Sequence, residues 1–157
     1  MADFNVNKTN DIAALAWPPG KTLVMKRTVD FSVAANQLAQ NAIMALFMIP
    51  AHVKVREVLM RVITADADIT TVELGAYSRV AATETITEID LDGFGVNGTL
   101  AATGYVAMDV DAVYNPQGTG ARGYVGTSEW YVCVKNTDAQ TLDEAEVEFI
   151  AICEDLR

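Results

Sequence analysis

The feature that most constrains the fold is one long run of strand-forming residues that begins just after Pro50. Residues 51–65 contain neither glycine nor proline, and most of them are β-branched, methionine or long charged side chains. Within the run, Val53 and Val55 alternate with Lys54 and Arg56, which is the period of two that a half-buried strand requires. A helix would repeat its apolar residues every third or fourth position. The pattern therefore predicts one long central strand with neighbours on both edges.

The apolar phase of this run shifts by one position after Glu57, so that Val58, Met60 and Val62 carry it on. Since one extra residue in a strand moves every following side chain to the other face, the shift predicts a β-bulge or a change of neighbouring sheet.

Shorter runs of the same kind recur on both sides of the central strand. They cover residues 21–33, 44–49, 69–75, 85–89, 100–114, 129–135 and 145–153. Turn residues separate them; Gly75 is expected to end one strand, and Asp90–Gly95 and Asn97-Gly98 are expected to form turns. Residues 34–45 have a composition that suits one or two turns of helix. About seven to nine unequal strands without a repeat predict an all-β, single-domain β-sandwich with jelly-roll-like topology over residues 21–157.

Residues 1–20 differ from this domain and predict an extended N-terminal arm. They combine turn-favouring Asn and Asp residues with a short apolar segment, residues 12–17, and end in a stiff Pro-Pro-Gly turn. The arm either folds back on its own domain or reaches a neighbouring subunit. The residues expected to contact a partner are Leu15, Trp17, Pro18 and Pro19.

Charge and targeting signals narrow the class of protein. The formal net charge is −10 and the pI is about 4.4, which disfavours binding to nucleic acid or to an anionic membrane surface. The first residues lack the features of a secretory signal, and the most apolar window, residues 43–55, is too short to span a bilayer. We therefore expect a soluble protein made in the cytosol. Cys133 and Cys153 are expected to be free, partly buried thiols, with a disulfide between the last two strands as the alternative.

Few residues suggest catalysis, a metal or a cofactor. The single histidine, His52, has no nucleophile or acid nearby in the sequence and is expected to be a partly exposed residue at the start of a strand. Asp90 with Asp92, and Asp109 with Asp111, have a spacing that suits Ca²⁺, but the remaining ligands of a calcium loop are missing.

Three glutamates, Glu144, Glu146 and Glu148, are expected to share one solvated face of a strand. Glycosidase chemistry would need a further carboxylate from elsewhere in the chain. The glycines of residues 118–123 are not followed by the Lys and Ser/Thr of a phosphate-binding loop. The sequence therefore predicts a protein that is not an enzyme, with no catalytic residue, metal or cofactor.

A binding module is a separate possibility, because aromatic side chains can stack on sugars. The candidates for such a platform are Tyr105, Tyr124, Trp130 and Tyr131. Core packing and subunit contact are the competing roles of these residues.

Several of these strands together resemble a recurrent pattern of tailed-bacteriophage virion structural proteins. The matching segments are Ile49–Val53, Val58–Ala65, Thr71–Gly75, Asp92–Phe94, Trp130–Asn136 and Val147–Ile152. The pattern has a glycine where this chain has His52 and an acidic residue where it has Ala76.

The resemblance covers roughly residues 45–155 and implies a β-sandwich component of the virion. It further implies a head-decoration (cement) protein that sits on the capsid surface as a homo-oligomer, commonly a trimer, and bridges subunits of the major capsid protein. A component of the tail, a fibre or a spike is the alternative within the virion, and the carbohydrate-binding β-sandwich is the alternative outside it. The resemblance transfers no functional residue.

Overall fold

The computed structural model describes residues 4–6, 22–80, 82–83, 85–108 and 125–156. These residues form strands and one turn of 3-10 helix at Ala34–Asn36. The strands are β1 (Phe4–Val6), β2 (Thr22–Asp30), β3 (Ile43–Ile49), β4 (Val53–Thr64), β5 (Val72–Val80), β6 (Thr85–Gly98), β7 (Gly104–Tyr105), β8 (Trp130–Asn136) and β9 (Glu146–Asp155).

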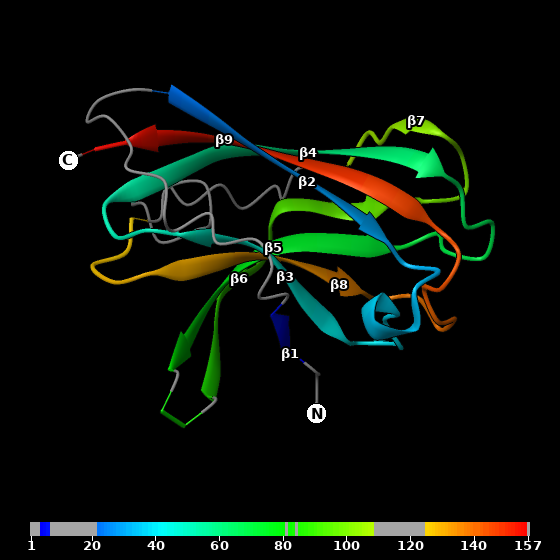
Figure 1. Cartoon of the computed structure of the whole chain (residues 1–157), viewed down its shortest axis with the longest axis horizontal. Helices are drawn as coiled ribbons and strands as arrows, with labels where there is room; N and C mark the ends of the chain where they lie inside the picture. Colours follow the sequence, from blue (N-terminus) through cyan, green and yellow to red (C-terminus); the bar gives the residue numbers. More distant parts are fainter. Residues whose placement is uncertain (1–3, 7–21, 81, 84, 109–124, 157) are drawn as a thin grey trace.

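The strands make two sheets that pack face to face (Figure 1). Sheet A has the order β1-β3-β8-β5-β6 and sheet B the order β2-β9-β4-β7. Counted from β2 to β9, sheet B holds the first, eighth, third and sixth strands, and sheet A the second, seventh, fourth and fifth. This is the strand order of a jelly roll, which confirms the predicted topology. Strand β1 adds to the edge of sheet A as a parallel neighbour of β3.

The long run after Pro50 is β4, the central strand that the sequence predicts. Its register with β9 is irregular between Val55 and Glu57, where the apolar phase of the sequence shifts. The two edges of β4 differ, because β9 pairs along almost its whole length whereas β7 pairs only at Arg61 and Val62.

The core lies between the sheets and is built from the inward residues of both. Its largest fully buried side chain is Trp130 of β8, which stacks on Phe94 of β6 with ring centroids 6.4 Å apart. Residues after β6 close one end of this core: a Cβ on Gly98 would lie 2.9 Å from the Met108 Cε atom and 3.0 Å from the Met60 Cε atom. The ends of both methionine side chains therefore pack closely against the backbone at position 98.

Two predictions about the middle of the chain are wrong. Strand β5 does not end at Gly75 but continues to Val80, because Gly75 pairs with Cys133 inside sheet A. Residues 90–95 do not form a turn, since β6 runs through them with irregular register. The hairpin of β5 and β6 extends beyond the two layers (Figure 1). Asn97 has the positive φ expected of a turn residue, but Gly98 still pairs with Val72.

The sandwich buries one arginine at an edge, beside an irregularity of β3. Arg27 of β2 faces inward, and its Nη1 atom donates to the carbonyl oxygens of Ala45 (2.6 Å) and Leu46 (3.1 Å). The register of β3 shifts between Ala45 and Phe47, so these carbonyls lie where the ladder is disturbed. Burial lowers the pKa of the Arg27 guanidinium. The contact ties β2 of sheet B to β3 of sheet A.

Candidate interaction surfaces

The partner contacts predicted from the sequence, Leu15, Trp17, Pro18 and Pro19, lie outside the described residues. The same holds for Asp109, Asp111, Tyr124 and the glycines of residues 118–123. The described surfaces considered next are the outward sides of the two sheets, a pocket beside the core and the loops at one end.

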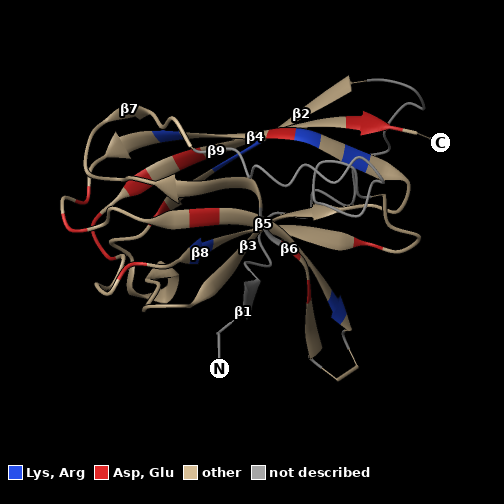
Figure 2. Cartoon of the chain, turned by 180° about the vertical axis from the view of Figure 1, so that it is seen from behind, with Lys and Arg blue, Asp and Glu red and all other residues tan. Residues whose placement is uncertain are grey.

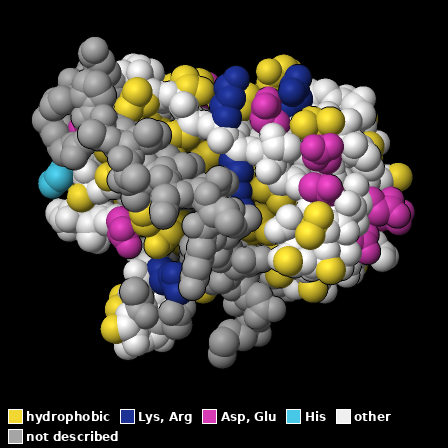
Figure 3. All heavy atoms as spheres, viewed as in Figure 1, with side chains coloured by type: hydrophobic (Ala, Val, Ile, Leu, Met, Phe, Trp, Pro, Cys, Tyr) yellow, Lys and Arg dark blue, Asp and Glu magenta, His cyan; other side chains and the backbone are white. Residues whose placement is uncertain are grey.

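The outward side of sheet B, here called the B face, is a charged surface with apolar residues between the charges. It consists of Val24, Lys26, Arg56, Leu59, Arg61, Glu148, Ile150, Ile152 and Glu154. Figure 2 shows the cations along β4 and the carboxylates along β9. Side chains of both signs also lie close together along the upper edge of Figure 3.

Two ion pairs link β4 to β9 on the B face. The Arg56 Nη2 and Glu154 Oε2 atoms are 2.6 Å apart, and the Arg61 Nε and Glu148 Oε1 atoms are 3.3 Å apart. Both arginines are exposed, so each pair contributes about 0–1 kcal/mol to stability. Of the three glutamates expected on one strand face, Glu146 and Glu148 belong to β9, and Glu144 precedes it.

The outward side of sheet A, here called the A face, carries an apolar cluster that was not anticipated from the sequence, beside the charged register pair Glu73 and Lys135. Ile43 and Ala45 of β3, Tyr77 of β5, and Tyr131 and Cys133 of β8 form a cluster separate from the core. All five are buried, and Met48 and Ile86 pack against them. The sequence feature that could have revealed this cluster is the unbroken apolar run of β8. Residues Trp130 to Val134 are all buried, so this strand is covered on both faces instead of alternating between buried and exposed residues.

The two thiols belong to different sheets, and only one of them faces the core. This arrangement excludes the alternative of a disulfide between them. Cys133 belongs to the A face, whereas Cys153 faces the core between the sheets. Both are free, as predicted, and both are fully buried where partial burial was expected. Burial raises the pKa of Cys133 well above its ordinary value and raises the pKa of Cys153 to about 12. Both thiols are therefore protonated and weakly reactive near neutral pH.

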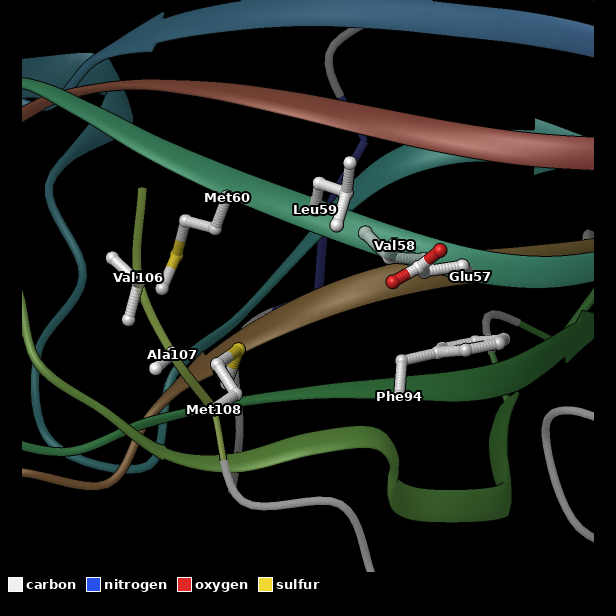
Figure 4. Close-up of a pocket in the computed structure, with 8 residues that line it drawn as sticks. All are labelled: Glu57, Val58, Leu59, Met60, Phe94, Val106, Ala107 and Met108. Carbon is white, nitrogen blue, oxygen red and sulfur yellow. The ribbon is translucent and has the colours of Figure 1, made fainter. Parts of the chain in front are cut away.

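A pocket of about 230 Å³ opens beside the core, lined by Glu57, Val58, Leu59, Met60, Phe94, Val106, Ala107 and Met108 (Figure 4). Its lining comes from β4, from β6 and from the segment after β7. Glu57 is the one ionisable side chain in that lining, and no nucleophile accompanies it. The arrangement offers an apolar surface and one carboxylate, which is suited to packing rather than to acid–base chemistry.

The single histidine is exposed, as predicted, but lies in the turn that precedes β4. His52 has a φ of 63°, donates its backbone N–H to the Gly126 carbonyl oxygen and accepts from the Leu156 N–H. A left-handed position such as this one is where glycine is common, which matches the glycine of the phage pattern. Within the described part of the chain, no group of three or more His, Cys, Asp or Glu residues could hold a metal ion.

The structure removes two of the four aromatic residues proposed for a sugar platform. The Trp130 side chain lies in the core, and Tyr131 belongs to the A face. Tyr105 is exposed on β7, on the other sheet. The three residues that the structure describes therefore do not form a common platform.

Two carboxylates organise the loops at one end of the sandwich. Asp66 is buried and accepts from the backbone N–H groups of Asp68, Asp143 and Glu144. Asp138 is exposed and accepts from the Thr70 N–H and hydroxyl, and these bonds lower its pKa to about 2. Both carboxylates already serve as acceptors for the loops that they join.

Comparison with known proteins identifies the fold. No protein-family model matches the chain, and no curated protein matches it in sequence. Within the described residues, no helix is long and apolar enough to cross a membrane. A chain from the solved capsid of Ralstonia phage GP4 is similar in structure, with a TM-score of 0.64 and 17% sequence identity. The match covers 88% of this chain and 86% of that chain. The two chains therefore share their fold along almost their full length.

Proposed function

We propose that this protein is a non-catalytic structural component of a tailed-bacteriophage virion that attaches to the capsid. The observation that carries the proposal is the jelly-roll match with a chain of a phage capsid over 88% of the sequence. The motifs in β4, β5, β8 and β9 that resemble phage structural proteins support it independently.

The finer role that we propose is decoration of the outer capsid surface. The chain would assemble as a homo-oligomer, most simply a trimer, and bridge subunits of the major capsid protein after synthesis in the host cytoplasm. A net charge of −10 suits a position outside the shell, away from the packaged genome. Leu15, Trp17, Pro18 and Pro19 of the arm are the proposed contacts with a partner.

Binding to capsids that lack this protein tests the role directly. Purified full-length chain is mixed with such capsids of its own phage, and bound protein is measured after sedimentation. We expect saturable binding and, in native mass spectrometry, an oligomer of the free chain. A strict monomer that does not sediment with capsids would contradict the proposal.

Labelling of intact virions separates decoration from a role in the tail. An antibody against the chain should label the whole head surface if the protein decorates the capsid. Label confined to one vertex or to the tail would assign the protein to a tail, fibre or spike instead.

A further inference from the structure

The edge of β4 that faces β7 is paired along only part of its length. The ladder with β7 holds two register pairs, at Arg61 and Val62, and the Val106 N–H donates to the Met60 carbonyl oxygen (2.9 Å). Over residues 53–59, no described strand pairs with β4 on this side. The first half of the strand therefore has a free edge within the described part of the chain.

The backbone of Val58 points toward this free edge. In an antiparallel ladder, successive residues direct their N–H and C=O groups alternately to the two neighbouring strands. The register of β4 with β9 is regular from Glu57 to Val62, and the Met60 carbonyl points toward β7. The groups of Val58 therefore point the same way, and no backbone group of the described residues bonds to them there. They offer one donor and one acceptor to an added strand.

The pocket of about 230 Å³ lies beside these groups. Four consecutive residues of β4, 57–60, line it, so the edge of the strand and not a single face runs along the pocket. Phe94, Val106 and Met108 supply apolar walls opposite that edge (Figure 4). The volume is below the roughly 300–1,000 Å³ that is usual for small-molecule sites, and it suits one apolar side chain.

The charge beside the pocket is negative. Glu57 pairs with Ile152, so its side chain lies on the side of the B face, whereas the side chain of Val58 points to the core. Glu57 is exposed, and none of the described lysines and arginines forms an ion pair with it. In a strand added to β4, the residue next to the one opposite Val58 lies opposite Glu57. A basic side chain at that position would be attracted to the carboxylate.

Charge also disfavours two sources of such a strand within this protein. If the register of Arg61 with Tyr105 continued along β4, Asp109 would lie opposite Glu57. Like charges that face each other across two strands destabilise a sheet. A second copy carries the same net charge of −10 and would be repelled in general. A basic segment of a different protein is the better match.

We propose that the pocket and the free edge of β4 bind an extended segment of another protein, in which an apolar side chain stands next to Lys or Arg. The segment adds to β4 as a strand and exchanges backbone hydrogen bonds with Val58. Its apolar side chain enters the pocket between Phe94 and Met108, and its basic side chain lies near Glu57. The inference does not depend on the proposed function, because a chain that fails to bind capsids can still bind such a segment.

Two peptides test this chemistry on the full-length chain. Acetyl-Thr-Thr-Lys-Leu-Lys-Thr-Thr-amide has a lysine on each side of its leucine, so one lysine meets Glu57 in either strand direction. The second peptide has glutamate in place of both lysines. Isothermal titration calorimetry should give a Kd of roughly 10 µM to 1 mM for the lysine peptide and at least about fivefold weaker binding of the glutamate peptide. Absence of saturable binding by the lysine peptide, or equal binding of both, overturns the proposal.

Charge reversal at position 57 tests the role of the carboxylate. Glu57→Lys should reverse the preference, so that the glutamate peptide binds at least about threefold more tightly than the lysine peptide. Glu88→Lys makes the same change at an exposed glutamate outside the pocket and should leave the preference unchanged. If both variants shift the preference alike, the peptides respond to net charge and the assignment to this pocket is wrong.

A bulky residue tests the role of the pocket. Ala107 is an exposed part of the lining, and Ala107→Trp should abolish binding of the lysine peptide by filling the space for the leucine. Ala101→Trp places the same side chain at an exposed position outside the pocket and should leave the Kd unchanged. Unaltered binding to Ala107→Trp would contradict the proposal.

Amide hydrogen exchange followed by NMR tests the added strand itself. The Val58 N–H should exchange at least about tenfold more slowly with the lysine peptide bound, whereas the Leu59 N–H, which points toward β9, should be protected with or without peptide. Protection of Val58 in the free chain that rises with protein concentration would show that a second copy occupies the edge. Protection at every concentration would show that the chain covers its own edge. Either result would refute binding of another protein at this site.

Discussion

The two outward faces of the sandwich differ although the sheets share one core. On the B face, Val24 is 56% exposed, and cations pair with carboxylates across the strands. Ile150 is buried there, but its register neighbours are the long side chains of Lys26 and Leu59. On the A face, Cys133 is buried between Ala45 and Gly75.

This difference distinguishes two reasons for burial in a sheet. A residue such as Ile150 is sheltered by large neighbours in its own sheet, and such shelter needs no further layer. Cys133 lies between small residues in its row, and its burial goes with that of Ile43, Tyr77 and Tyr131 in the same cluster. The B face therefore carries exposed apolar and charged side chains, whereas the cluster on the A face is buried.

The strongest test of the difference between the two faces is to introduce the same charged side chain on each. Ala45→Asp should destabilise the protein by on the order of 3 kcal/mol, because the carboxylate would be buried without a partner. Val24→Asp, at an exposed position, should change the free energy of unfolding by no more than about 0.5 kcal/mol. Urea denaturation followed by tryptophan fluorescence in a Trp17→Phe background, which leaves Trp130 as the only tryptophan, measures both. Equal effects at the two positions would show that the A face is open to solvent.

Two isoleucines give a milder test with the same change of side chain. Ile43 on the A face is 6% exposed, and Ile63 of β4 is 41% exposed. Ile43→Ala should cost about 2–4 kcal/mol through lost burial and a cavity. Ile63→Ala should cost less than about 1 kcal/mol. A small effect at Ile43 would mean that little packs above it.

The thiols extend the comparison to alkaline pH. A raised pKa favours the protonated form in the folded state, so the stabilisation is complete below the ordinary value of 9.0 and is lost as the pH rises through the folded pKa. For Cys153 this window runs from 9.0 to about 12, with a slope of about 1.4 kcal/mol per pH unit. Cys133 should add a slope of the same sign, because burial raises its pKa as well.

Alanine variants separate the two thiols in this titration. Cys133→Ala and Cys153→Ala should each flatten the fall in unfolding free energy between pH 9 and 11, whatever they cost at neutral pH. Burial also raises the pKa of Tyr131, and Cys133 contributes to that rise, so the two alanine variants are compared in a Tyr131→Phe background. If only Cys153→Ala flattens the curve, the A face is hydrated.

The sequence predicted the sandwich well because alternation is local. The shift of the apolar phase after Glu57 predicted the irregular register of β4. The two alternating runs at residues 129–135 and 145–153 predicted β8 and β9. It failed where a residue's role depends on a distant strand. Gly75 looks like a strand end until Cys133 of β8 is placed beside it.

The surfaces were harder to predict for the same reason. Cys133 and Ala45 are 88 positions apart in the chain numbering, and only the register of β3 and β8 joins them in one row. The apolar residues of the arm were visible in the sequence, but the buried cluster of the A face was not. The resemblance to phage proteins indicated a class of protein but did not predict which residues form an interaction surface.

The smallest expected effect concerns the ion pairs of the B face. Arg61 and Glu148 lie 3.3 Å apart with the arginine side chain 44% exposed, so water and salt screen their attraction. In a double-mutant cycle of Arg61→Ala and Glu148→Ala, the coupling energy should be below about 1 kcal/mol and should shrink further in 1 M salt. Urea denaturation of the four proteins at two salt concentrations gives this energy. A salt-resistant coupling above about 2 kcal/mol would require that something shields the pair from water, and the B face would then be a second covered surface.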